Sequence, residues 1–191
     1  MNKFSVYAFI FVFAMQDNAI STSQLQPALD QFIFEFVQQQ NFLDLDWKVG
    51  DSADYKVDMG MVKGDMHSFV REKNAKGYWI QQDMNMGPMG KQKIEILIDK
   101  DTGAMLELLV NGQRQQPPKQ NMQVLESREE KVTVPAGTFD SMFLKIKNKD
   151  DNKITLTWIN PEIVPIGGMM KTIAPGPMGE VKVDMTAYKK Q

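Results

Sequence analysis

The chain has 191 residues, 42% of them hydrophobic, with 22 basic and 24 acidic side chains and a formal net charge of -2. This length and apolar content fit one domain with its own core, and the lack of a basic excess argues against nucleic-acid binding. The chain has no cysteine, which excludes disulfides, a lipid-anchored cysteine, thiol catalysis and thiolate metal sites.

Residues 1–21 have the features of a secretory signal peptide. Lys3 supplies a positive charge, residues 4–15 form an apolar run, and Ala19 and Ser21 are small residues suited to a cleavage site. The run is too short to cross a bilayer. We predict a signal peptide over 1–21, a single β-rich domain over 22–191, and a periplasmic or secreted protein that does not span a membrane. The alternative is a buried helix or an uncleaved anchor.

Apolar residues then recur at helical spacing from Leu25 to Val37, with glutamines on the opposite side. Pro27 suits the first turn of a helix. We predict one helix here, the only substantial one in the chain. Its wide apolar stripe must pack against something, and the sheet predicted below is the only large partner.

From Trp47 onward the pattern changes to an alternation of apolar and polar residues between turn signals, which is typical of an antiparallel meander. The polar, proline-bearing segment 111–120 is predicted to be a flexible loop. Strands are predicted over residues 51–61, 66–73, 78–84, 91–99, 106–110, 123–134, 140–147, 154–158 and 181–185.

The clearest turn signal is Pro135-Ala136-Gly137. Pro135 has a preset φ for the first corner, and Gly137 can adopt the left-handed conformation that closes a three-residue hairpin loop. Val132 and Val134 are predicted to share the buried face of the incoming strand. In a later strand, Ile154, Leu156 and Trp158 are expected to face inward, with Thr155 and Thr157 outward.

About nine or ten strands and one N-terminal helix predict a mainly β (α+β) fold, in which a curved antiparallel sheet or incomplete barrel is capped by the helix. A sheet of this size twists and does not stay flat. Its concave face would enclose either a filled core or a pocket.

The segment from Glu130 to Asp140, followed by Thr157 to Pro161 and Asp184 to Tyr188, resembles a group of uncharacterised exported bacterial β-proteins similar in plan to the lipoprotein-carrier (LolA/LolB-like) fold. Trp47 to Gly50 and Asp54 to Val57 fit the opening strand of the same pattern. The resemblance implies a half-barrel with an apolar lining and transfers no catalytic residue. Carriers of that fold hold acyl chains.

Methionine is unusually frequent, with 15 in the chain. Residues two apart in a strand share a face, so Met59 with Met61, and Met84 with Met86, would present paired thioethers. Thioethers select Cu(I), and an adjacent histidine could add an imidazole. The residues of such a copper site would be Met59, Met61, Met66, His67, Met84 and Met86. Packing or cavity lining is the favoured interpretation, because methionine is a flexible apolar filler.

Other chemistry has weaker signals. Residues 87–90 and 176–179 both read Gly-Pro-Met-Gly, and they are predicted to be matching turns at a cavity mouth, since neither opens the helix that a phosphate loop requires. His67 is the only histidine, and no Gly-x-Ser-x-Gly elbow accompanies it. Carboxylate pairs for glycoside hydrolysis give no specific signal among 24 acidic residues.

The leading hypothesis is an exported, non-enzymatic binding or carrier protein, without a cofactor, for an apolar ligand (a lipid or acyl chain) or a partner's apolar segment. Its partners would be an apolar small molecule or lipid and another envelope protein. The alternatives are a periplasmic Cu(I)-binding protein and an envelope scaffold or assembly protein with a filled core. The predicted cavity lining is Tyr55, Met59, Met61, Trp79 and Met84.

Overall fold

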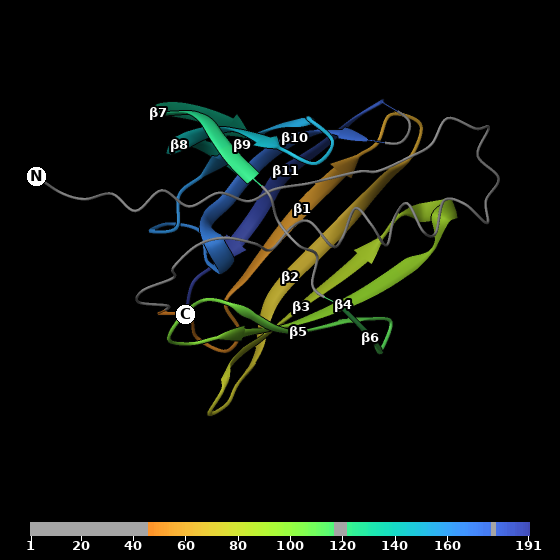
Figure 1. Ribbon diagram of the computed structural model, residues 1–191, viewed down its shortest axis with the longest axis vertical. Coiled ribbons are helices and arrows are strands. Elements are labelled where there is room, and N and C mark those ends of the chain that lie inside the picture. Colours follow the sequence, from red (N-terminus) through yellow and green to blue (C-terminus); the bar gives the residue numbers. More distant parts are fainter. Residues whose placement is uncertain (1–45, 117–121, 177–178) are drawn as a thin grey trace, which may run out of the picture.

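The computed structural model describes residues 46–116, 122–176 and 179–191, which form one antiparallel sheet of eleven strands (Figure 1). Two 3-10 turns accompany it, η1 (Gly87–Met89) and η2 (Ile166–Gly168). The strands are β1 (Ser52–Asp58), β2 (Lys63–Lys73), β3 (Gly77–Asn85), β4 (Lys91–Asp99), β5 (Met105–Val110), β6 (Gln113–Gln115), β7 (Met122–Val134), β8 (Gly137–Asn148), β9 (Ile154–Ile159), β10 (Met169–Gly176) and β11 (Gly179–Lys189).

The predicted signal peptide and the predicted helix over 25–37 lie outside the described residues. Within the three described ranges there is no α-helix. No helix in this part of the chain is long and apolar enough to cross a membrane.

The sheet order is β6-β5-β4-β3-β2-β1-β11-β10-β9-β8-β7. We call β1 to β6 the first wing and β7 to β11 the second wing; they meet where β1 pairs with β11. Figure 1 shows the first wing descending from β1 and the second wing above it. Every pairing joins strands that are adjacent in sequence except the one at this seam, and β6 and β7, although adjacent in sequence, form the two edges of the sheet. The sheet is therefore built from two meanders joined by the pairing of β1 with β11.

Chain length requires the sheet to curl. Only residues 116–121 connect the two edge strands, β6 and β7, and such a connection reaches roughly 25 Å when fully extended. Eleven strands laid flat would place the edges about 48 Å apart. The edges are therefore held much closer together than a flat sheet allows.

The predicted count of nine or ten strands is too low. One of the additional strands is β6, which lies in the segment 111–120 predicted to be a loop. A hairpin turn joins β5 to β6 at Asn111 and Gly112, whose φ values are 51° and 79°. Two consecutive positive φ values are those of the tight hairpin turn for which Asn-Gly is the preferred sequence. The other is β10, whose glycines and methionines obscured its alternation.

The predicted hairpin is present between β7 and β8, with Val132 and Val134 buried. Val134 pairs with Gly137, so the loop has two residues rather than the predicted three. The backbone N–H of Ala136 donates to the carbonyl oxygen of Met185 at 3.2 Å. The tip of this hairpin therefore reaches β11 and curls the second wing.

The two faces of β9 were predicted the wrong way round. Thr155 and Thr157 are buried, whereas Trp158 is half-buried and Ile154 is 39% exposed. The hydroxyl of Thr157 contacts the Thr172 hydroxyl at 2.9 Å and the Lys171 carbonyl oxygen at 3.1 Å. These hydrogen bonds make threonine compatible with a buried face.

Trp158 lies on the outer face, where other side chains cover it. Its ring is 5.1 Å from that of Phe143, the Lys171 ammonium lies 5.7 Å from it, and its indole N–H donates to the Glu130 carboxylate. These neighbours shield the aromatic ring from water, so its burial does not require a position on the inner face.

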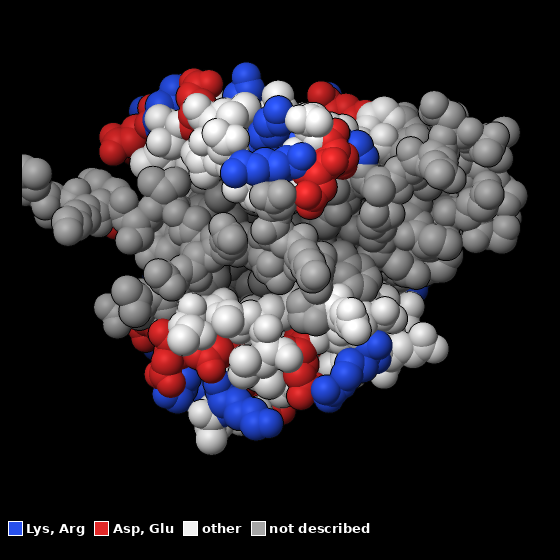
Figure 2. Space-filling view, in the orientation of Figure 1, with Lys and Arg blue, Asp and Glu red and all other residues white. Residues whose placement is uncertain are grey.

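Figure 2 shows acidic and basic side chains mixed on both wings in this view. Cross-strand and near-neighbour ion pairs account for much of the mixing, as between Lys56 and Asp65 or Lys131 and Asp140. Exposed pairs of this kind add little stability, but they leave no large surface of one sign in this view.

Candidate functional site

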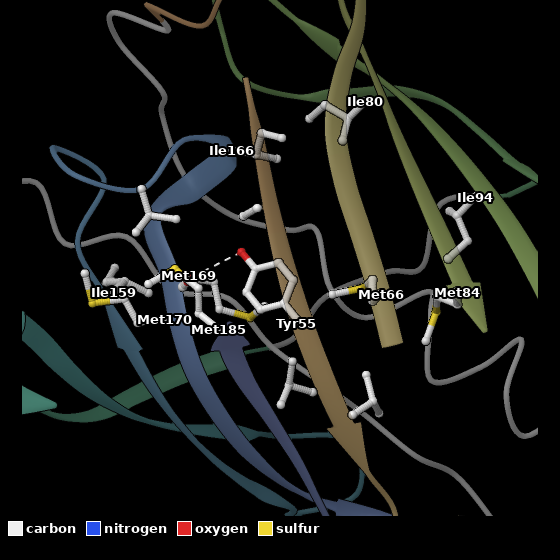
Figure 3. Close-up of a cluster of buried hydrophobic side chains, with 14 of the residues drawn as sticks. Tyr55, Met66, Ile80, Met84, Ile94, Ile159, Ile166, Met169, Met170 and Met185 are labelled. Atoms are coloured by element: carbon white, nitrogen blue, oxygen red, sulfur yellow. Dashed lines mark hydrogen bonds between the residues drawn. The ribbon is translucent and has the colours of Figure 1, made fainter. Parts of the chain in front are cut away.

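Cross-strand pairing places four large side chains of the inner face in one row. Met84 pairs with Met66, Met66 with Tyr55, and Tyr55 with Met185. All four are at most 5% exposed, and Figure 3 shows them among the buried side chains on the same side of the sheet. This set, which we call the methionine row, crosses β3, β2, β1 and β11 and so joins the two wings.

Tyr55 is fixed within the row by its hydroxyl. The hydroxyl donates to the carbonyl oxygen of Met169 at 3.1 Å, at the start of β10 (Figure 3). Burial raises the pKa of Tyr55 well above its ordinary value, and the nearby charge of Asp54 raises it further. Tyr55 is therefore a neutral phenol that ties β1 to β10.

Two further methionines are buried to one side of the row, directly after the ends of β1 and β3. Met59 is 2% exposed, and Met86 is fully buried. Met86 occupies the space above Gly64, where an added Cβ would lie 2.5 Å from the Met86 sulfur. Because β1, β3 and β10 all run toward this end of the sheet, the Gly-Pro-Met-Gly segment at 87–90 lies here as the connection from β3 to β4. Of the segment at 176–179, Gly176 and Gly179 are described, and they pair with each other at the same end.

The five residues predicted to line a cavity do not all lie on the inner face of the sheet. Tyr55, Met59 and Met84 are buried, with Tyr55 and Met84 linked through Met66 in one row. Met61 is 89% exposed in the turn after β1, because the strand ends at Asp58 and its alternation does not extend to residue 61. Trp79 lies on the outer face, 5.1 Å from the Arg71 guanidinium.

The residues of the hypothetical copper site are divided in the same way. Met66 and His67 are adjacent in a strand, so their side chains point to opposite faces. The Nδ1 of His67 lies 2.6 Å from the Asp54 carboxylate, and its ring stacks on Phe69 at 5.1 Å. The imidazole is thus separated from the buried thioethers. No group of three or more His, Cys, Asp or Glu side chains that could hold a metal occurs in the described ranges.

Sequence reasoning missed a polar pair in the inner face. Ser68 and Gln82 pair directly across β2 and β3 and are each 2% exposed. Neither the Ser68 Oγ nor the Gln82 Nε2 has a hydrogen-bond partner within the described structure. The signal was available, since Ser68 lies two residues after Met66, and Gln82 two residues before Met84. Period-two alternation puts both on the methionine face.

Protein families, curated proteins and solved structures were each compared with this chain. No family, curated protein or solved structure matches it. A function must therefore be inferred from the side chains of the site.

Proposed function

We propose that this protein is an exported, non-enzymatic carrier that binds an apolar ligand, a lipid or an acyl chain, on the inner face of its sheet. The observation that carries the proposal is the methionine row, in which three unbranched, adaptable methionines and the fixed ring of Tyr55 lie in line across the seam of the two wings. Thioether side chains can repack around guests of different shape. A periplasmic or secreted location is part of the proposal, and the signal peptide predicted from the sequence supports it.

The geometry of the sheet supports the same proposal. A single antiparallel sheet whose edges are connected by residues 116–121 has a concave side, and that side carries the apolar residues. The resemblance to lipoprotein carriers implies a half-barrel with an apolar lining, and that expectation is a further support for the proposal. The inner face offers a large apolar area to such a ligand.

The test is native mass spectrometry of the purified protein, together with titration of a fluorescent acyl probe. We expect copurified lipid and an increase in probe fluorescence. Met66→Gln places an amide in the methionine row and should weaken probe binding roughly tenfold. Met61→Gln, at a position 89% exposed, is the matched control and should leave binding unchanged.

Absence of both lipid and fluorescence enhancement would overturn the carrier proposal and favour a scaffold with a filled core. Equal effects of the two glutamine variants would show that the probe binds elsewhere. Circular dichroism of each variant separates lost binding from lost folding.

A further inference from the structure

The unpartnered pair formed by Ser68 and Gln82 is expected to lower the stability of the fold. A buried hydroxyl or amide that lacks a hydrogen bond destabilises a fold, and most buried polar groups in proteins have partners. Here two such groups lie side by side. They are enclosed along their own strands by Met66 and Val70 on β2 and by Ile80 and Met84 on β3, all at most 5% exposed.

The second wing shows what a satisfied polar pair looks like in this sheet. Thr157 and Thr172 are also cross-strand partners on the inner face, and their hydroxyls lie 2.9 Å apart. The Thr157 hydroxyl also donates to the Lys171 carbonyl oxygen. The fold thus satisfies one buried polar pair internally and leaves the Ser68 Oγ and the Gln82 Nε2 of the other without a partner.

From this difference we infer that Ser68 and Gln82 form a subsite for the carbonyl oxygen of an acyl ester or amide, with the attached hydrocarbon on the methionine row. The inference rests on the proposed function and names its ligand class. The Ser68 hydroxyl and the Gln82 amide NH2 are both hydrogen-bond donors, so two bonds to one carbonyl oxygen would satisfy both groups.

The chemistry of the surroundings selects a neutral head group. No lysine or arginine is buried in the described part of the chain. The one buried charged residue there is Asp51, whose carboxylate already accepts the backbone N–H groups of Lys48 and Gln191. A carboxylate or phosphate placed beside Ser68 would lose its hydration without gaining a counter-ion. An ester or amide carbonyl carries no such penalty.

The experiment compares three competitors of the fluorescent acyl probe with equal chain length: a fatty-acid methyl ester, the free fatty acid and the alkane. For the unmodified protein we expect the ester to bind roughly tenfold more tightly than the alkane, as one or two hydrogen bonds allow, and more tightly than the ionised acid. In the double variant Ser68→Ala, Gln82→Leu, the ester and alkane affinities should converge while alkane binding persists.

Thr157→Val is the matched control, because it removes a buried inner-face hydroxyl that already has partners. It should lower stability without changing the ratio of ester to alkane affinity. A second measurement does not depend on the variants: the infrared stretch of a 13C-labelled ester carbonyl bound to the unmodified protein should fall below its frequency in an alkane solvent.

Equal binding of ester and alkane, or an unshifted carbonyl stretch, would overturn the subsite and leave the carrier proposal standing. That result would mean that the pair holds only a water molecule. Failure of all three competitors and of the probe to bind would overturn the carrier proposal, and the subsite with it.

Discussion

The two wings cover their outer aromatic side chains in the same way. In the first wing, the Arg71 guanidinium lies 5.1 Å from the Trp79 ring and pairs with Glu95. In the second, the Arg128 guanidinium lies 3.9 Å from the Phe143 ring, with carboxylates on both sides of it. An arginine can cover a ring with its plane and keep its charge in water. On the outer face of the sheet, both wings thus shield an aromatic ring from water with an arginine side chain.

On the inner face of the sheet, the two wings differ in the hydrogen bonding of their buried polar side chains. The second wing pairs its buried threonine hydroxyls with each other, whereas the first wing leaves Ser68 and Gln82 without partners in the described structure. Polar groups that a fold satisfies serve stability, and those that it leaves open are available to a ligand. The subsite proposed above therefore lies in the first wing, whereas the satisfied threonine pair lies in the second.

The largest expected effect tests whether the wings fold as one unit. A Cβ on Gly77 would lie 1.8 Å from the carbonyl oxygen of Ile98, so Gly77→Ala must separate β3 from β4 and should lower the free energy of unfolding by about 3 kcal/mol or more. Urea unfolding monitored by tryptophan fluorescence should remain a single transition, since β1 and β11 pair along their length. A second wing that unfolds separately would contradict this.

Gly60→Ala is the control for that variant. Gly60 has φ of +83° and no atom within 4 Å of an added Cβ, so only backbone strain is introduced, worth about 1 kcal/mol.

The next effect separates the two polar pairs. Thr157→Val should lower the free energy of unfolding by about 1 to 2 kcal/mol, because it leaves the Thr172 hydroxyl without its side-chain partner. Ser68→Ala removes a group without a partner and should change stability by less than about 0.5 kcal/mol or raise it slightly. Thermal denaturation of both variants gives the answer. Equal losses would remove the distinction between the wings.

A smaller effect concerns the bond between the wings. Tyr55→Phe removes the hydrogen bond to the Met169 carbonyl oxygen and should cost about 1 kcal/mol. Burial raises the pKa of Tyr55 in the folded protein. The stability that the neutral phenol contributes is therefore fully present below the unfolded-state pKa of about 10, and it is lost as the pH rises above that value. Urea unfolding at alkaline pH should therefore show a weaker pH dependence for Tyr55→Phe than for the unmodified protein. Tyr188→Phe, at a position 39% exposed, is the control.

Acid should affect the turns of the first wing. In the turn after β4, the backbone N–H of Thr102, followed by its hydroxyl, lowers the pKa of Asp99. A lowered pKa means that the contribution to stability is present above the ordinary Asp pKa of about 3.9 and is lost as pH falls through the folded-state value. The hydrogen-exchange protection factors of residues 99–105, which correct for the slower intrinsic exchange of amides in acid, should fall on acidification, less so in Asp99→Asn. Thr102→Val, which keeps the N–H donor, should show an intermediate response.

The smallest expected effect is that of copper. With His67 on the face opposite Met66, the buried thioethers would have to bind Cu(I) without an imidazole. Titration under reducing conditions should therefore show no competition with a weak Cu(I) chelator. Competition that is lost in a Met66→Leu, Met84→Leu variant would revive the copper hypothesis.

The alternation of apolar and polar residues along the sequence predicted much of this structure. Val132 and Val134 are buried together as predicted, and the hairpin at Pro135 is present because its turn residues encode it locally. The alternation failed at Met61, which follows the end of a strand, and at Trp158, where cover from other strands made the outer face suitable for a large ring. Such cover depends on residues distant in sequence and cannot be deduced from period alone.

The candidate site was predictable only in part. Tyr55 and Met84 were identified because they are large and in phase with apolar neighbours. Ser68 and Gln82 were passed over because their polarity favoured the outer face, although their phase placed them inside. Their lack of partners depends on cross-strand neighbours, which only the register of β2 and β3 reveals.

The two edge strands bear on how copies of this chain meet one another. The edge strand β6 has three residues, and β7 carries a closely spaced set of charged side chains along its exposed stretch. A short edge and a charged edge are both poor templates for the addition of a strand from a neighbouring molecule. Both edges therefore disfavour the growth of fibres by pairing between the sheets of successive copies.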